Sequence, residues 1–138
     1  CANGAKAGIR VILSAQDPES IAQSPSGAKI FQNLTTRLIG RIQPNAVDSF
    51  TSILKYPQSI IACNATESFF PKKEGFYSQW LLDDNGIFTG TRYYPPFNLL
   101  AIVANNPIEQ EYRTAAMKKY GDKFVAVTEF SKQLVTAL

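Results

Sequence analysis

The fold of this chain is constrained most by an apolar segment near its beginning, Ile9 to Ala15, in which Val11, Ile12 and Leu13 follow one another. A nearly continuous apolar stretch of this length is typical of a strand buried on both faces of a parallel sheet. The polar run Gln16-Asp17-Pro18-Glu19 follows, and it favours a helix start with an aspartate cap. The sequence therefore predicts an interior strand that leads into a helix. Gln16 would lie at the carboxyl end of that strand, where open α/β sheets bind ligands.

The remaining pattern alternates between helices and strands. A strand is expected at Thr36–Ile42, and a hairpin at Gly75–Tyr94 around the turn Asp84-Asn85-Gly86. Phe97–Ala104 is either a buried strand or a short helix, and its length and β-branched content favour the strand. Helices are expected at Ala28–Leu34, from Gln43 to Leu54, after Pro57, from Pro107 behind an Asn106 cap, and from Phe124 to Leu138. Because 45% of the residues are hydrophobic and only 18% are charged, we expect one α/β domain over residues 1–138 with a substantial core.

The composition removes several classes of function. There is no histidine, which excludes Ser-His-Asp and Cys-His catalysis and most zinc sites. Cys1 and Cys63 match no metal spacing, so no metal site is expected. The net charge of +3 permits an acidic partner without requiring nucleic acid. The longest apolar run, Leu99 to Ala104, is too short to span a bilayer.

The chain also lacks the parts that bind nucleotide phosphates. A phosphate-binding loop needs G-x-x-x-x-G-K-[ST], and no Gly-Lys pair occurs in the sequence. Asp83 and Asp84 follow an apolar run, as a magnesium-binding carboxylate would, but Asn85-Gly86 comes next and favours a hairpin tip. We therefore expect that the chain does not hydrolyse ATP on its own.

Several stretches nevertheless resemble one family. The segment from Gly4 to Ser20, with its apolar strand ending in Gln16, is similar to part of the conjugative-transfer ATPases of type IV secretion systems, within the HerA/FtsK motor group. The resemblance continues more diffusely through Ile30–Ile39, Trp80–Asp83, Leu99–Pro107 and Glu111–Arg113. It covers nearly the whole chain, but only the strand ending in Gln16 is fairly specific.

This resemblance implies a fold and a set of site residues. The chain would form the C-terminal part of a RecA-like domain, with a mostly parallel sheet, a β-hairpin and C-terminal helices. Gln16 would sense the γ-phosphate, both as a catalytic and as a cofactor-binding residue. The family's trans-acting arginine falls on Ala5, a departure that leaves Lys6 beside it, or Arg37 and Arg41 further along, as candidates for the catalytic charge.

The resemblance also implies cofactors, partners and a location. The intact protein would bind ATP and Mg²⁺, whereas this piece alone would bind neither. Its partners would be the rest of its own ATPase domain, identical subunits in a ring and components of the secretion channel, with DNA as a further candidate. It would have no transmembrane segment and would work in the cytoplasm, at the inner face of the bacterial membrane.

Ordinary interpretations remain open for each of these residues. Gln16 could simply cap the following helix, Lys6 could be a solvated lysine, and Arg37 and Arg41 could form surface ion pairs. Arg113 is expected to pair with Glu109, one helical turn earlier, and the aromatic residues around the hairpin are expected to serve packing. Cys1 marks either the start of a piece of a longer chain or the lipidated residue of a bacterial lipoprotein. The latter would make the protein a lipid-anchored or secreted binding module.

Overall fold

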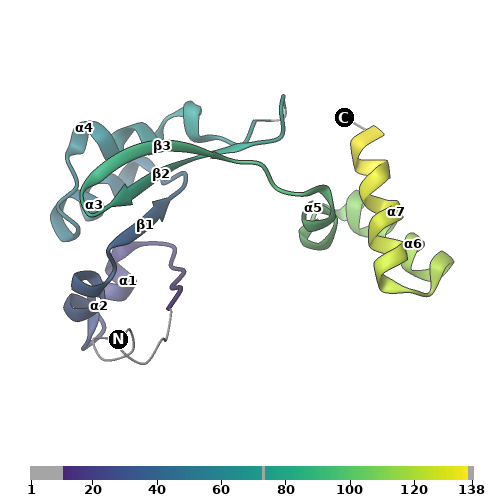
Figure 1. The fold of residues 1–138 in the computed structure, drawn as a ribbon, viewed down its shortest axis with the longest axis horizontal. Helices are drawn as coiled ribbons and strands as arrows, with labels where there is room; N and C mark the ends of the chain where they lie inside the picture. Colours follow the sequence, from purple (N-terminus) through teal and green to yellow (C-terminus); the bar gives the residue numbers. More distant parts are fainter. Residues whose placement is uncertain (1–10, 73, 137–138) are drawn as a thin grey trace. The chain divides into compact units, whose positions relative to one another are not determined.

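The computed structural model describes residues 11–72 and 74–136. They form two compact units (Figure 1). The first unit extends to Pro71 and includes Ser78–Tyr93, and the second combines Lys72–Tyr77 with the chain from Tyr94 onward. The two units are described separately below.

The first unit contains a three-stranded antiparallel sheet in the order β1-β2-β3, built from β1 (Thr36–Ile39), β2 (Ser78–Asp84) and β3 (Ile87–Tyr93). Asn85 and Gly86 join β2 to β3 with positive φ angles of 51° and 86°. Two successive left-handed residues are the signature of a tight hairpin turn, which Asn-Gly adopts readily. The hairpin and its turn, both predicted from the sequence, are confirmed.

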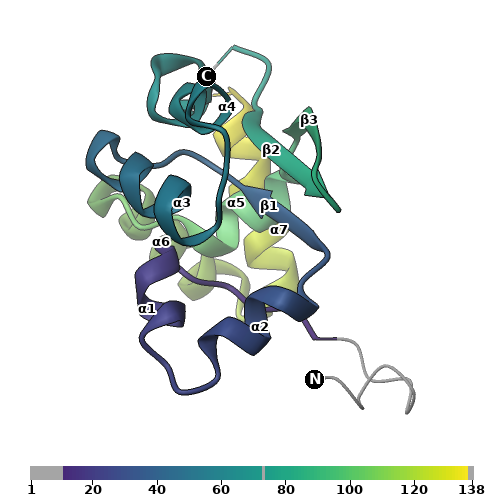
Figure 2. The same cartoon turned by 90° about the vertical axis from the view of Figure 1, so that its left-hand side faces the viewer.

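Short helices and 3₁₀ turns complete this unit: α1 (Pro18–Ala22), α2 (Gly27–Asn33), η2 (Pro44–Ala46), α3 (Val47–Ile53), α4 (Gln58–Ile61), η3 (Ala62–Ala65) and η4 (Glu67–Phe69). The predicted cap of α1 is confirmed, because Asp17 Oδ1 accepts a hydrogen bond from the Ser20 amide at 2.7 Å. Helices α3 and α4 lie against one face of the sheet (Figure 2). Their Phe50 and Ile61 form the core with Ile39 and Leu81.

A buried asparagine fixes the chain as it leaves β1. Asn64 is fully buried, and its side-chain nitrogen donates to the carbonyls of Ile39 at 3.0 Å and Gly40 at 2.9 Å. The backbone carbonyl of Asn64 accepts a hydrogen bond from the Ile42 amide at 3.1 Å. These contacts hold the residues after β1 in place, including Arg41, and so determine where the arginine can reach.

The prediction of a mostly parallel, RecA-like sheet is wrong, because the described strands form one antiparallel sheet. Residues 9 and 10 lie outside the described residues, and residues 11–15 are irregular rather than an interior strand. Val11, Ile12 and Leu13 are exposed, Ile12 to 97%. The reason is that β2 pairs with both β1 and its own hairpin partner β3, and no described strand pairs with residues 11–15. A short apolar run does not itself specify which strand it would join.

The second unit consists of α5 (Phe97–Val103), α6 (Pro107–Tyr120) and α7 (Lys123–Thr136), packed around Ala101, Ala116, Ala126 and Phe130. The predicted start of α6 is confirmed, since Asn106 Oδ1 accepts the Ile108 amide at 3.0 Å. The strand expected at Phe97–Ala104 is wrong. The segment forms the alternative, a short helix. Ala101 is a small residue with high helix propensity, and it is completely buried where α5 packs against α7.

The expected ion pair between Arg113 and Glu109 is also absent. The Arg113 guanidinium instead donates to the carbonyls of Ile102 at 2.8 Å and Ala104 at 3.1 Å, at the end of α5. The last carbonyls of a helix have no partner within the helix, and they form the negative end of its dipole. A cation there is therefore favoured both by hydrogen bonding and by charge. Arg113 therefore ties α6 to α5.

Candidate functional site: a groove beside β1

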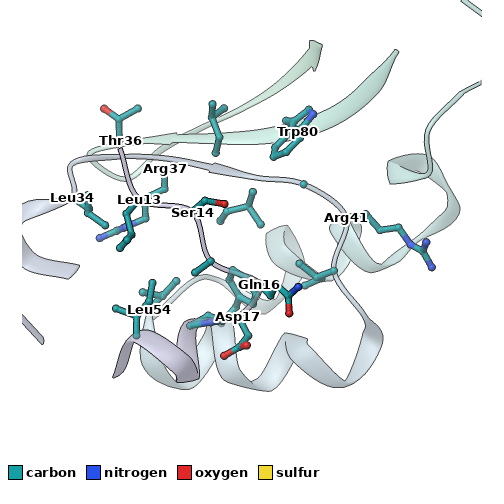
Figure 3. A pocket seen from close by; sticks show the side chains of 18 of the residues that line it. Leu13, Ser14, Gln16, Asp17, Leu34, Thr36, Arg37, Arg41, Leu54 and Trp80 are labelled. Carbon is teal, nitrogen blue, oxygen red and sulfur yellow. The ribbon is translucent and has the colours of Figure 1, made fainter. Parts of the chain in front are cut away.

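A groove of about 910 Å³ opens in the first unit between residues 11–18 and β1 (Figure 3). It is also lined by Leu34 and Leu54, the residues that follow α2 and α3, and by Trp80 near the start of β2. Figure 3 shows Leu13, Leu34 and Leu54 gathered near Arg37, with Gln16 further along the groove. The groove therefore has an apolar end and a polar end.

Three of the four site residues predicted from the sequence line this groove: Gln16, Arg37 and Arg41. Lys6 lies outside the described residues. The structure thus brings together a glutamine and two arginines that are far apart in sequence. The three side chains are not equivalent, however, because they differ in the hydrogen bonds and ring contacts that they form within the protein.

Gln16 has an exposed side chain whose carboxamide forms no hydrogen bond with the described residues. Asp17, and not Gln16, provides the side-chain cap of α1. The alternative role of Gln16 as a helix cap is therefore not what the structure has. The carboxamide keeps one acceptor and two donor hydrogens for a ligand.

Arg37 is committed to the structure. Its Nη1 donates to Asp83 Oδ2 at 2.9 Å and its Nη2 to the Phe31 carbonyl at 2.9 Å. Only 26% of its side chain is exposed. The two hydrogen bonds join β1 to β2 and to α2, which is the ordinary ion-pair role considered above.

Arg41 is exposed and differently placed. Its guanidinium carbon lies 3.7 Å from the centre of the Phe70 ring, a cation–π contact. Its side chain extends away from Gln16 in Figure 3. Within the described chain the guanidinium has no acidic partner, so its hydrogen-bond donors remain available.

Arg37, which lines the groove, belongs to a polar cluster that the sequence did not predict. Asp83 is 2% exposed and Tyr56 is 4% exposed, and the Tyr56 hydroxyl donates to Asp83 Oδ2 at 2.5 Å. The Gly86 amide donates to Asp83 Oδ1 at 2.8 Å, and Arg37 completes the set. The one signal available in the sequence was Asp83 itself, a carboxylate in an apolar strand.

The environment shifts the ionisation of this cluster. Burial alone would raise the pKa of the Asp83 carboxyl, but hydrogen bonds from Tyr56 and the Gly86 amide, together with Arg37, hold it below its ordinary value. Burial, followed by the hydrogen bond to Asp83, raises the pKa of Tyr56 to about 12. The carboxylate is charged and the phenol neutral at physiological pH, an arrangement that stabilises the sheet.

The raised pKa of Tyr56 predicts a loss of stability in alkali. A phenol that holds its proton more tightly when folded contributes stability below pH 10, and this contribution disappears as the pH rises through about 12. Two pKa units correspond to roughly 3 kcal/mol. We expect Tyr56→Phe to lose less unfolding free energy than the parent between about pH 9 and 12, measured by urea titration. Tyr94→Phe, at an exposed tyrosine, should behave like the parent, and equal pH dependence in all three proteins would contradict the assignment.

The described residues offer little for other chemistry. They contain no group of three or more potential metal-ligating side chains, and none of their helices is long and apolar enough to cross a membrane. Comparisons with family models, with curated proteins and with solved structures find no match to this chain. The groove and its exposed polar side chains are therefore the features that bear on function.

Proposed function

We propose that this chain is the C-terminal piece of a motor ATPase that powers DNA conjugation or type IV secretion. In the intact protein Gln16 contacts the nucleotide of its own subunit and Arg41 that of a neighbouring subunit, and the rest of the ATPase holds the phosphates and Mg²⁺. The observation that carries the proposal is the position of Gln16. It ends the segment on which the family resemblance depends, and its carboxamide is exposed, unbonded to the described chain and at the edge of a groove.

The roles of the two arginines differ in this proposal. Arg41 is the better candidate for the trans-acting charge, because its donors are not used by a carboxylate. A planar guanidinium suits the charge that spreads over a phosphoryl group in transfer. Arg37 is assigned a structural role, since Asp83 and the Phe31 carbonyl already bind it. Gln16 acts from an irregular segment rather than from the end of a strand.

The proposed setting follows from the same resemblance. The partners are the remainder of the ATPase domain, neighbouring subunits of a ring and secretion-channel components, with DNA as a further candidate. The work takes place at the inner face of the bacterial membrane, in the cytoplasm. Arg41 would then act on the nucleotide of a neighbouring subunit, which is how a ring couples hydrolysis between sites.

The isolated chain should neither hydrolyse ATP nor bind it tightly. Most of the affinity of such sites comes from a backbone cradle and its lysine, which this sequence lacks. We expect no turnover above a mock-purified control and no saturable binding tighter than about 10 µM, measured by phosphate release and calorimetry. Turnover that is abolished by a substitution within this chain would refute the proposal that the groups holding the phosphates and Mg²⁺ lie in the rest of the ATPase.

A second candidate is a binding module for another protein, lipid-anchored or secreted. The exposed apolar residues Val11, Ile12, Leu13 and Leu38 in and beside the groove favour it. The coding sequence upstream of Cys1 separates the two. A phosphate-binding loop supports the motor ATPase, and a hydrophobic signal segment that ends in small residues supports the module.

A further inference from the structure

The turn between α6 and α7 carries an unusual surface. We call the segment from Lys118 to Val125 the α6–α7 tip; it joins the end of α6 to the start of α7 (Figure 1). Within it, Phe124 is 86% exposed, Val125 47% and Tyr120 39%. Single exposed apolar residues are common on proteins, but three within six residues of the chain need an explanation.

These apolar residues contribute nothing to the core of their own unit. Helix α7 packs inward through Ala126 and Phe130, each 1% exposed, and α6 through Ala116. Phe124 lies two residues before Ala126 and therefore on another face of the helix. Phe124 is therefore exposed because the buried face of α7 is the one that carries Ala126 and Phe130. A change of its side-chain rotamer cannot bury it.

The tip is also positively charged. Lys118, Lys119 and Lys123 are exposed, and Lys119 Nζ lies 5.1 Å from the centre of the Tyr120 ring. The one carboxylate in the tip belongs to Asp122, whose Oδ1 accepts a hydrogen bond from the Val125 amide at 3.0 Å and so caps α7. The tip thus carries three ammonium groups and one carboxylate within the same eight residues as its apolar side chains.

We propose that the α6–α7 tip binds the surface of an anionic lipid bilayer. Phe124 and Val125 would enter the boundary between headgroups and acyl chains, with Tyr120 at headgroup depth. The lysines have long stems that let their ammonium groups reach the lipid phosphates beside the inserted rings. This inference does not depend on the proposed ATPase function, since it rests on the second unit alone.

The chemistry favours a bilayer over a nucleic acid or an acidic protein. Single-stranded nucleic acid would use Phe124 and Tyr120 as stacking surfaces but would leave Val125 without a partner. An acidic protein would need its own apolar pocket for Phe124, the most exposed aromatic side chain among the described residues. A bilayer accepts both apolar side chains without requiring a matching shape.

Vesicle co-sedimentation of the whole chain tests the proposal. We expect binding to vesicles of phosphatidylcholine with about one-third phosphatidylglycerol and much weaker binding to phosphatidylcholine alone, with a strong decrease as salt is raised. Phe124→Ser should weaken binding about tenfold or more. Lys119→Gln and Lys123→Gln should each weaken it about fivefold. The matched control is Ile108→Ser, which removes a 62% exposed apolar residue at the other end of α6, and it should change nothing.

Insertion itself is measured with a tryptophan. In a Trp80→Phe background, the Phe124→Trp variant has one indole, at position 124. Its fluorescence should shift to the blue on the anionic vesicles and should be quenched by brominated acyl chains. Equal binding by the Phe124→Ser variant, or Trp fluorescence that the brominated lipids leave unchanged, would overturn the proposal. So would binding to single-stranded DNA or to an acidic peptide with no binding to vesicles.

Discussion

Asp83→Ala should destabilise the first unit by about 3 kcal/mol. The carboxylate accepts three hydrogen bonds, from Arg37, from the Tyr56 hydroxyl and from the Gly86 amide. Its removal leaves the buried Tyr56 hydroxyl and one donor of the largely buried Arg37 guanidinium without an acceptor. A buried donor with no acceptor costs the full free energy of its desolvation. A thermal melt should show a decrease of about 10 °C.

Asp84→Ala provides the control, because Asp84 is the exposed neighbour of Asp83 and accepts a hydrogen bond from Thr36 Oγ1 at 3.2 Å. It should cost no more than about 0.5 kcal/mol. Acid should act in the same direction as Asp83→Ala. Since the pKa of Asp83 is lowered in the folded protein, its contribution is present above the ordinary carboxyl pKa and disappears as the pH falls through the lowered value. Equal stability of the two alanine variants would show that the cluster contributes little.

Gln16→Ala in the intact ATPase should lower turnover about 100-fold while changing nucleotide affinity little. A side chain that helps to orient the attacking water and to stabilise the γ-phosphate acts mainly in the transition state. Its loss therefore decreases kcat with no matching rise in KM. The melting temperature should stay within about 2 °C of the parent, because Gln16 is exposed and has no hydrogen bond to lose within the described residues.

The matched control is Gln23→Ala, which removes an exposed glutamine side chain at the other end of α1. It should leave kcat, KM and melting temperature unchanged. If Gln16→Ala lowers the melting temperature and leaves turnover per folded molecule unchanged, Gln16 has a structural role only. Measurement of steady-state kinetics, nucleotide binding and melting on the same preparations separates these results.

The elements that the sequence predicted correctly are those fixed by local chemistry. Asn85-Gly86 specifies a tight turn through its left-handed residues, and Asp17 and Asn106 cap helices whose first residue is proline. Each of these signals acts within four residues, so the sequence around it is sufficient. Gln16, Arg37 and Arg41 line one groove, but the roles assigned to them from the sequence stay predictions.

The elements that it missed depend on contacts between distant residues. Whether Val11–Leu13 becomes a strand depends on a neighbour to pair with, and Phe97–Val103 became a helix because Ala101 packs against α7. Arg113 found the carbonyls that end α5 instead of Glu109. Tyr56 meets Asp83 across 27 positions of sequence, and spacing alone does not predict such a pair.

The central claim, that Gln16 faces a bound nucleotide in the intact protein, is tested most directly by thiol protection. With Cys1 and Cys63 replaced by serine, Gln16→Cys places a thiol in the groove, and Thr89→Cys places one at an exposed position of β3 as a control. We predict that a non-hydrolysable ATP analogue with Mg²⁺ slows alkylation of the thiol at position 16 about tenfold and leaves that at position 89 unchanged. Alkylation at position 16 at the same rate with and without saturating nucleotide would contradict the account.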